Sequence, residues 1–470
     1  MVGIKRLFGC DMGDRAGRDG AAVVSSKSGR RGAEGTTDRA GRRGAIIAGM
    51  CALTFAAALS FPSAAQAATA SLATTPEAGV PVASEVQVPA GTQLGEPASA
   101  SESDAELQAK GIEKDTFTIS VPGAFRQTEA RSILDLVNAA RAGVGSSALT
   151  WDTNLEQVAQ LRAAELVLTF SHTRPDGRDC FTAAGDMGTS FGTTAGENIF
   201  MSSGNASAVV ANGAWTNSPG HYQNMVNSSF TSMAAASFSY AGATFWVEVF
   251  GGTSGTGFNT QATDGNRYVN TEATAQYLPF IFSDVSSGDW FIQGGGKNFL
   301  YALNNKLMTG YSGTHYFGPW DSVTRGQVAT ILYRMEGSPA ASSQDFSDVD
   351  YGQYYGNAIR WARSARVISG YDGNVFAPDN PVSREDLAVM LSNYAKYKGL
   401  DVSSDMAKAE AMPDWGSVDS YAQQALGWAL DKGIMSGSDE GGVRYLRPLG
   451  NAQRCAAATM MATFHRDVLS

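Results

Sequence analysis

Apolar and polar positions in the central part of the chain follow two different periodicities. Over residues 133–143 apolar side chains recur every three or four positions, which predicts a helix that ends at Gly143. Residues 153–170 repeat this pattern, and their Thr-x-x-Glu start is typical of a helix capping box. Residues 245–250 predict a strand, with side chains alternating between two faces. Helices followed by a late strand predict an α+β fold built in layers.

A basic and then apolar stretch opens the chain. Arg42 and Arg43 precede an apolar run at residues 45–61, and residues 65–67 have the small-x-small pattern of a cleavage site. The apolar run is short and rich in Ala, which is unfavourable for a spanning helix. We therefore expect a long leader with a secretion signal peptide at residues 1–67, and no transmembrane span in the mature chain.

Two stretches lack both periodicities. Residues 68–124 are mainly Ala, Ser, Thr, Pro, Val and Glu, and residues 253–279 are rich in Gly, Thr and Asn. Such compositions bury too little apolar surface to order themselves, so we expect two linkers. The linkers delimit a first globular domain at residues 125–252.

Composition and charge exclude some classes of protein. The chain is 43% hydrophobic, and its formal net charge is −10. Because nucleic acid is a polyanion, this charge opposes nonspecific association, and we expect no nucleic-acid partner. Two of the four cysteines lie in the leader, which leaves Cys180 and Cys455. This number is too small for a disulfide scaffold, so packed cores must stabilise the fold.

Three ionisable residues of the first domain stand among small or turn-forming residues. They are His172 in SHTRPDG, Glu197 in AGENI and His221 in WTNSPGHYQNM. If they converge in a solvent-facing cleft, they could form a metal site or an acid–base pair. The alternative is a buried hydrogen-bond network. Two His and one Glu are an incomplete ligand set for a divalent metal such as zinc, so metal binding is the weaker expectation.

Two further residues have less direct support. Glu248 shares a face of the expected strand with Trp246 and Phe250, and we weigh a role in the cleft against a solvated strand face. Cys180 lies in a loop rich in Gly and Asp without an indicated His partner, so we interpret it as a bystander. The chain has no Gly-x-Ser-x-Gly motif, and a serine hydrolase therefore has no support.

The motifs of residues 126–251 together resemble the bacterial branch of the CAP superfamily, which includes cysteine-rich secretory, antigen 5 and pathogenesis-related proteins. The similar segments are LVNAARAGVG, LTWDTNLEQVAQLRAAEL, SHTRPDG, AGENI, WTNSPGHYQNMVN and FWVEVFG. The resemblance implies an α–β–α sandwich with a cleft lined by His172, Glu197 and His221. Animal and plant members have a second Glu between the AGEN and GH motifs, which this chain lacks. Glu248 is the nearest candidate for that fourth position.

A threefold repeat follows the second linker. Phe-Ser-Asp-Val occurs twice and Met-Pro-Asp-Trp occupies the third site, which aligns Asp284, Asp348 and Asp414. Each repeat then runs through a helix that we expect to end in Gly, and a second helix starts at TRGQ, SRED or QRCA. The first start is a capping box, the second a near version, and the third lacks the cap. The pattern resembles three S-layer homology repeats, at residues 280–340, 341–400 and 410–468.

This second resemblance implies a mostly α-helical module with three lobes, whose grooves hold an anionic secondary cell-wall polysaccharide. The residues carried over are Arg325, Arg384 and Arg454, and Trp320 is a candidate for stacking on sugar. An arginine at a helix start, beside unpaired backbone N–H groups, suits an anion. We rank Arg325 and Arg384 above Arg454. The alternative is that each arginine pairs with the aspartate of its own repeat, although we interpret those aspartates as helix caps.

These features predict a secreted protein that is attached to the cell wall and displays a CAP domain at the cell surface. We expect the CAP domain to bind a lipid, wall or host component in its His/Glu cleft. The alternative is a metal-assisted or His/Glu acid–base hydrolase that acts on a peptide, lipid or wall substrate.

Overall fold

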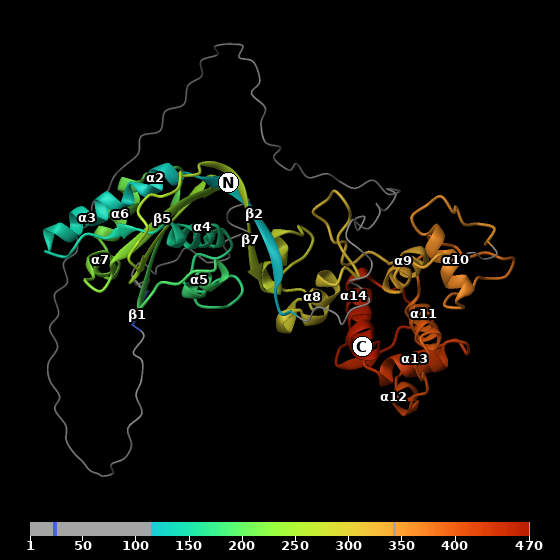
Figure 1. Cartoon of the computed structure of the whole chain (residues 1–470). Helices are drawn as coiled ribbons and strands as arrows, with labels where there is room; N and C mark the ends of the chain where they lie inside the picture. Colours follow the sequence, from blue (N-terminus) through green and yellow to red (C-terminus); the bar gives the residue numbers. More distant parts are fainter. Residues whose placement is uncertain (1–21, 26–113, 342–344, 470) are drawn as a thin grey trace, which may run out of the picture. The chain divides into compact units, whose positions relative to one another are not determined.

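The computed structural model describes residues 22–25, 114–341 and 345–469 (Figure 1). The expected signal-peptide run at residues 45–61, its cleavage site at 65–67 and the linker stretch 68–113 lie outside the described residues.

A single mixed sheet organises the first part of the described chain. Its strand order is β1-β4-β6-β5-β2-β7, with β3 beside β5, and only the β3–β5 pairing is parallel. The strands are β1 (Ala22–Ser25), β2 (Phe117–Phe125), β3 (Thr150–Trp151), β4 (Thr194–Ser203), β5 (Ser232–Tyr240), β6 (Ala243–Gly251) and β7 (Gly265–Ala273). Nearly every residue of β5 and β6 is buried, so helices or loops must cover both faces at the centre of this sheet.

Helices cover both faces of the sheet. They are α2 (Gln127–Arg131), α3 (Ile133–Gly143), α4 (Thr153–Leu168), η2 (Cys180–Thr182), α5 (Ala183–Asp186), α6 (Ala208–Thr216) and α7 (Pro219–Val226). Figure 1 shows α4 and α5 on one side, with α2, α3, α6 and α7 on the other. This arrangement confirms the expected α–β–α sandwich.

The start of α4 differs from the expected capping box. Asp152 is the N-cap, and its side chain accepts a hydrogen bond from the Asn154 N–H. The Glu156 carboxylate accepts hydrogen bonds from Arg131 and from the Trp151 indole N–H instead of turning back to the helix start. A buried guanidinium and indole are stronger partners for a carboxylate than an end-of-helix N–H, so tertiary packing overrides the local motif.

The two expected linkers contain a pair of strands. β2 and β7 pair antiparallel over their whole length, from Phe117 opposite Ala273 to Phe125 opposite Gly265. The apolar side chains on one face of β2 are buried, which a solvated linker would not allow. The assignment of residues 117–124 and 265–273 to linkers is therefore wrong. Partner strands 140 or more residues apart supply the hydrogen bonds that their composition did not indicate.

The remaining described residues are mainly helical. The elements are η3 (Ala275–Phe280), η4 (Gln293–Gly295), α8 (Lys297–Asn304), α9 (Arg325–Met335), α10 (Gly356–Ser364), α11 (Arg384–Tyr397), α12 (Ala407–Glu410), η5 (Trp415–Ser417), α13 (Gln423–Asp431), β8 (Ser438–Glu440), β9 (Val443–Tyr445), α14 (Arg454–Thr463) and the π-helical η6 (Phe464–Val468). The capping box is present at Thr324 and Gln327, Ser383 caps α11, and Gln453 makes no side-chain cap, as expected.

Three backbone hydrogen bonds close the repeat region into a ring. The Val323 N–H donates to the Ala452 carbonyl, the Val382 N–H to the Val323 carbonyl, and the Ala452 N–H to the Val382 carbonyl. Each bond is 2.9 Å long. Because the third segment bonds both the first and the second, ring closure requires all three segments.

The repeat aspartates hold loops and do not cap helices. The two carboxylate oxygens of Asp284 accept from the Phe317 and Gly318 N–H groups, at 2.8 and 2.7 Å. Equivalent bonds join Asp348 to Phe376 and Ala377, and Asp414 to Leu446 and Arg447. The second donor of each pair has a positive φ, of 69°, 56° and 51° in turn. This conformation turns two successive N–H groups toward one anion, so the aspartate fits the loop better than a helix end.

The first helix of each repeat also ends earlier than expected. The residues that follow α8, α10 and α13 in left-handed conformation are Lys306, Arg366 and Gly433, with φ of 52°, 58° and 68°. Only the third is a Gly. Tertiary packing of the following Leu307 and Val367, both buried, offsets the cost of left-handed Lys and Arg.

Candidate functional site

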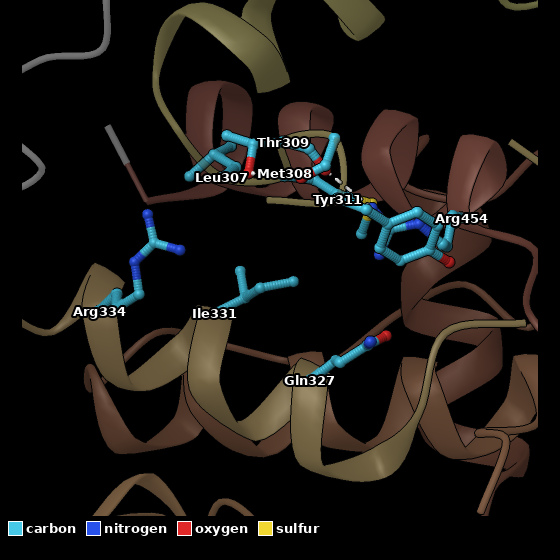
Figure 2. Close-up of a pocket in the computed structure, with 9 residues that line it drawn as sticks. Leu307, Met308, Thr309, Tyr311, Gln327, Ile331, Arg334 and Arg454 are labelled. Atoms are coloured by element: carbon cyan, nitrogen blue, oxygen red, sulfur yellow. Dashed lines mark hydrogen bonds between the residues drawn. The ribbon is translucent and has the colours of Figure 1, made fainter. Parts of the chain in front are cut away.

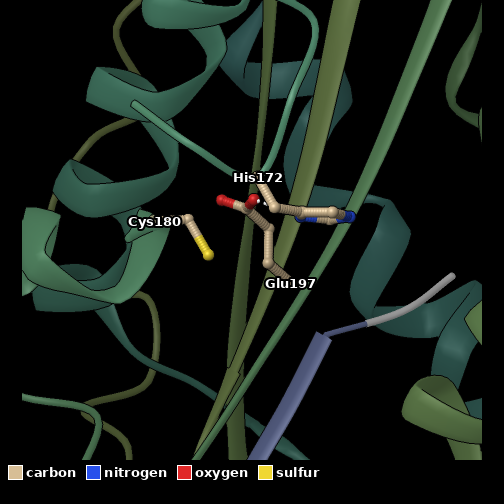
Figure 3. Close-up of side chains that lie close together, drawn as sticks. All are labelled: His172, Cys180 and Glu197. Carbon is tan, nitrogen blue, oxygen red and sulfur yellow. Dashed lines mark hydrogen bonds and ion pairs between the residues drawn. The ribbon is translucent and has the colours of Figure 1, made fainter. Parts of the chain in front are cut away.

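His172 and Glu197 form a hydrogen-bonded pair between the loop after α4 and strand β4. His172 Nδ1 lies 2.8 Å from Glu197 Oε1 (Figure 3). The Glu197 side chain is 1% exposed, whereas that of His172 is 24% exposed. Only the imidazole therefore reaches solvent, and the carboxylate does not lie in the solvent-facing cleft that we expected.

A buried arginine on α4 holds both oxygens of Glu197. Arg162 Nε and Nη2 lie 2.8 and 3.1 Å from the two carboxylate oxygens. Burial opposes ionisation of Glu197, but the Arg162 charge and the hydrogen bonds from His172 and Arg162 outweigh it and lower its pKa to about 2. Glu197 is thus an anion at neutral pH, and it fixes the orientation of His172.

The same arginine links this pair to a second ionic cluster. Arg162 Nη1 lies 2.7 Å from Glu165, which also accepts from Arg174 and from Thr271 on β7. Arg162 and Glu165 are fully buried. Our reading of the sequence missed both residues. Their signal is an Arg and a Glu three positions apart within the otherwise apolar stretch that runs to the end of α4.

Cys180 also lies beside His172 and Glu197, as Figure 3 shows. Ligand atoms of the three residues are all within 4.8 Å of one another. The bridge between Thr173 and Asp179 and the bond from the Cys180 N–H to the His172 carbonyl bring the cysteine back to the histidine. The expectation of no His partner is therefore wrong. Burial raises the pKa of the thiol, and the nearby Glu197 charge adds to this, so Cys180 is not a thiolate nucleophile.

These three residues do not fit a divalent metal in this arrangement. Both oxygens of Glu197 are committed to Arg162, and His172 Nδ1 is committed to Glu197. A guanidinium 2.8 Å from the carboxylate would also repel a cation at this position. Of the described residues only His172, Cys180 and Glu197 form a compact group of ligating side chains, and His221 is not a member.

His221 and Glu248 belong to a different network around Asn198. Neighbouring strand residues point to opposite faces, so Asn198 lies opposite the face that carries Glu197. Asn198 Nδ2 lies 3.0 Å from Glu248 Oε2 and 3.0 Å from the His221 carbonyl oxygen. Glu248 pairs directly with Asn198 across β4 and β6. Glu248 therefore does not join His172 and Glu197 in one cleft, and because it is fully buried, the reading as a solvated strand residue is also wrong.

The three helix-start arginines each contact the loop of the next segment. Arg325 Nε donates to the Phe376 carbonyl, Arg384 Nε to that of Leu446, and Arg454 Nε to that of Phe317. The contacts run from the first segment to the second, from the second to the third, and from the third to the first. Pairing of each arginine with the aspartate of its own repeat, the alternative reading, is therefore wrong.

The terminal nitrogens of these arginines meet different partners. Arg325 Nη1 lies 3.2 Å from the Asp386 carboxylate. For Arg384 and Arg454, the described part of the chain provides no carboxylate within salt-bridge distance. Burial lowers the pKa of both guanidinium groups, as expected for cations that are desolvated without a full counter-charge.

Arg454 lines a pocket together with the first repeat (Figure 2). We call this pocket the Arg454 groove. Its lining consists of Leu307, Met308, Thr309, Gly310, Tyr311, Gln327, Ile331, Arg334 and Arg454. The Arg454 guanidinium stacks 4.5 Å from the Tyr311 ring centre, and its Nη2 donates to the Thr309 carbonyl. Figure 2 shows Arg334 and Arg454 at opposite ends of the groove.

Trp320 lies outside this groove. Its side chain is 50% exposed, and its ring centre is 6.0 Å from that of Phe291. In the part of the chain that the structure describes, no helix combines the length and apolar character needed to cross a membrane.

Two family models match the chain. The cysteine-rich secretory protein family, CAP, matches residues 134–250, and the S-layer homology domain matches residues 281–329 and 345–388. The third segment lies outside both matches, although its ring contacts repeat those of the other two.

Several curated proteins are similar to parts of the chain. An endoglucanase of Bacillus sp. (strain KSM-635) is 30% identical over 194 residues, which cover 41% of this chain and 19% of the relative. The surface-layer 125 kDa protein of Lysinibacillus sphaericus is 23% identical over 39% of this chain and 16% of its own length. Protein YkwD of Bacillus subtilis is 31% identical over 29% of this chain and 52% of its own length. The chain thus spans about a fifth or less of the first curated relatives that it matches.

Among solved structures, an extracellular protein with an SCP domain from Bacillus anthracis is similar, with 26% identity and a TM-score of 0.23. The similar region covers 27% of this chain and 41% of that chain. Together with the family matches, the sandwich and the repeat ring lead to one assignment. The chain contains a CAP domain and S-layer homology domains, and it is a surface protein attached to the cell wall.

Proposed function

We propose that the S-layer homology region binds an anionic polysaccharide of the cell wall in the Arg454 groove. The observation that carries this proposal is the state of Arg454, which is 6% exposed, lines an open pocket and lacks a carboxylate partner among the described residues. A buried cation without a counter-charge is destabilising, and an anionic ligand would supply that charge. A planar guanidinium also suits carboxylate or phosphate groups of a polymer.

The other two arginines are less suited to this role. Asp386 already neutralises Arg325, and Gln327 occupies the equivalent position in the Arg454 groove. Arg384 lacks the aromatic ring that Tyr311 supplies to Arg454, because the equivalent residue is Ser438. We therefore place Arg454 first, which differs from the order that we expected from the sequence.

Binding of the purified full chain to isolated cell walls tests this proposal. We expect Arg454→Ala to weaken binding at least tenfold, and Arg325→Ala to weaken it less than threefold. Arg360→Ala is the control, because Arg360 pairs on the surface with Asp345 away from the groove. Arg454→Lys keeps the charge and shows whether the guanidinium geometry matters. Equal losses for Arg325→Ala and Arg454→Ala, with both variants folded, would contradict the proposal.

We also propose that the CAP domain, held at the wall in this way, binds a lipid, wall or host component through His172. The imidazole is the partly exposed member of the pair, and Glu197 fixes it through Nδ1, which leaves Nε2 to meet a ligand. We do not propose hydrolysis, because the raised pKa of the Cys180 thiol removes the nearest nucleophile.

The CAP proposal is tested with two named probes, phospholipid vesicles and isolated peptidoglycan. Wild type should bind at least one of them, and His172→Gln should bind that probe at least fivefold more weakly. His315→Gln is the matched control, since His315 is exposed in the repeat region. Equal binding by wild type and His172→Gln would contradict a role for His172.

A further inference from the structure

An open depression of about 420 Å³ lies beside the start of α8, apart from the Arg454 groove. The first repeat contributes Trp290, Lys297 and Asn298 to its lining, and the third segment contributes Ser436, Thr459 and Thr463. The wall thus combines one large aromatic ring, one cation and several neutral hydrogen-bonding groups. This mixture is typical of a site for a small polar ligand with an apolar face.

Trp290 is the dominant apolar surface of this depression. Its side chain is 51% exposed, and its ring makes an edge contact with Phe291, with centres 5.6 Å apart. Trp361 and Trp428 of the other segments are by contrast buried in the core. An exposed indole ring loses water favourably when a flat apolar face, such as that of a sugar ring, covers it.

An insertion found in the first repeat alone shapes the depression. Trp290 stands seven residues before α8 begins, whereas Tyr354 and Tyr421 stand two residues before α10 and α13 begin. The added residues include Gly294, Gly295 and Gly296, whose φ values are 65°, 92° and 57°. Three successive left-handed residues are accessible only to glycine at low cost, so this loop conformation is specific to the first repeat.

The polar groups of the depression match the rest of a sugar. Ser436 is exposed, and Asn298 presents an amide that already bonds Thr463 Oγ1 at 3.4 Å. Lys297 supplies a positive charge, and its ion pair with Asp115 is weak, since the distance is 3.4 Å and both side chains are about 70% exposed. An ammonium at the rim of a sugar site favours a sugar that carries a carboxylate or phosphate group.

We propose that Trp290, Lys297 and the Gly294–Gly296 loop form a second saccharide site, which takes an acidic sugar unit of the same wall polymer. This inference rests on the proposed function of the repeat region. It assigns sugar stacking to Trp290, whereas the sequence had indicated Trp320.

Titration of the full chain with glucuronic acid, followed by ligand-observed NMR, tests the second site. We expect Trp290→Ala to weaken binding at least tenfold and Trp290→Phe to retain most of it. Trp320→Ala is the matched control, because its ring is equally exposed but lines neither pocket, and it should bind as wild type does. Lys297→Gln should weaken glucuronic acid binding but leave the weaker binding of glucose unchanged.

The outcomes separate this site from the Arg454 groove. Wild-type affinity for glucuronic acid in Trp290→Ala would overturn the second site, even if Arg454→Ala loses cell-wall binding. Equal affinity of the wild type for glucose and glucuronic acid would overturn the acidic preference. Loss of glucuronic acid binding in Trp290→Ala while Arg454→Ala retains wall binding would instead support the second site and refute the groove.

Discussion

Asn198 donates a hydrogen bond to Glu248 across the centre of the CAP sheet, with 3.0 Å between Nδ2 and Oε2. Glu248 is fully buried, and its other oxygen has no hydrogen-bond partner among the described residues. Burial raises the pKa of Glu248 to about 8, and the bond from Asn198 offsets only part of this effect. At neutral pH the sheet therefore contains a protonated carboxyl group.

This relationship predicts that the CAP domain loses stability as pH rises. The folded state binds the Glu248 proton more tightly than the unfolded state, whose glutamate pKa is about 4.3. The free energy of unfolding should thus fall between about pH 4.3 and pH 8, with its full contribution present below that range. Glu248→Gln should remove the dependence, because an amide keeps the shape and stays neutral.

Thermal melts of wild type and Glu248→Gln at pH 5 and pH 9 measure this difference. The variant should gain several degrees over wild type at pH 9 and differ little from it at pH 5. A parallel pH dependence of the two proteins would show that Glu248 is ionised in the fold.

The Arg162–Glu197–His172 network should stabilise the CAP domain without a metal. Glu197→Gln leaves the buried Arg162 partly uncompensated, and removing one partner of a buried pair costs about 3–5 kcal/mol. His172→Ala removes one hydrogen bond and should cost about 1–3 kcal/mol. Because the pKa of Glu197 is lowered, its contribution should be present above about pH 4.3 and lost as pH falls toward 2.

Melts with and without Zn²⁺ separate this network from a metal site. We expect no shift of the melting temperature on addition of Zn²⁺ to wild type, and a lower melting temperature for His172→Ala under both conditions. His315→Ala should melt as wild type does. A rise of several degrees with Zn²⁺, abolished by His172→Ala, would establish the metal site that the geometry disfavours.

Replacing Asp386 should create a second anion site in the repeat region. Asp386 accepts from Arg325 at 3.2 Å and from the Tyr421 hydroxyl at 2.9 Å. Asp386→Asn can keep the bond from Tyr421 but no longer neutralises Arg325. Affinity for isolated cell walls should rise about three- to tenfold, and the added affinity should weaken with salt. The double variant Asp386→Asn with Arg325→Ala should return to the wild-type value.

The repeat aspartates should contribute more to stability than their exposed neighbours do. Asp348→Asn replaces one oxygen that accepts from the backbone by an amide nitrogen, which faces an N–H group. We expect a cost of about 1–3 kcal/mol to the repeat region, measured by denaturant unfolding. Asp372→Asn, an exposed change in the same repeat, should be neutral. Equal stability of the two variants would contradict the role of Asp348 in holding its loop.

Much of the organisation follows from local features of the sequence. The apolar periodicities of residues 133–143 and 245–250 predicted α3 and β6, since a helix or a strand with one buried face must repeat its apolar residues at its own period. The capping residues Thr324 and Ser383 located the starts of α9 and α11, because capping involves only neighbouring residues. Motif order was likewise sufficient to recognise the CAP and S-layer homology domains.

The partners of the charged residues were decided by tertiary structure alone. Arg162 and Glu197 are 35 positions apart, and Arg454 and Phe317 are 137 apart. Sequence by itself determined that His172, Glu197 and Glu248 are ionisable residues of one domain. Strand register then placed Glu197 and Glu248 on opposite faces of the sheet, and ring closure placed Arg325 beside Asp386 but Arg454 in an open groove. The physical reason is that a charge is compensated by whatever lies within a few ångströms of it, and pairing between distant segments sets that neighbourhood.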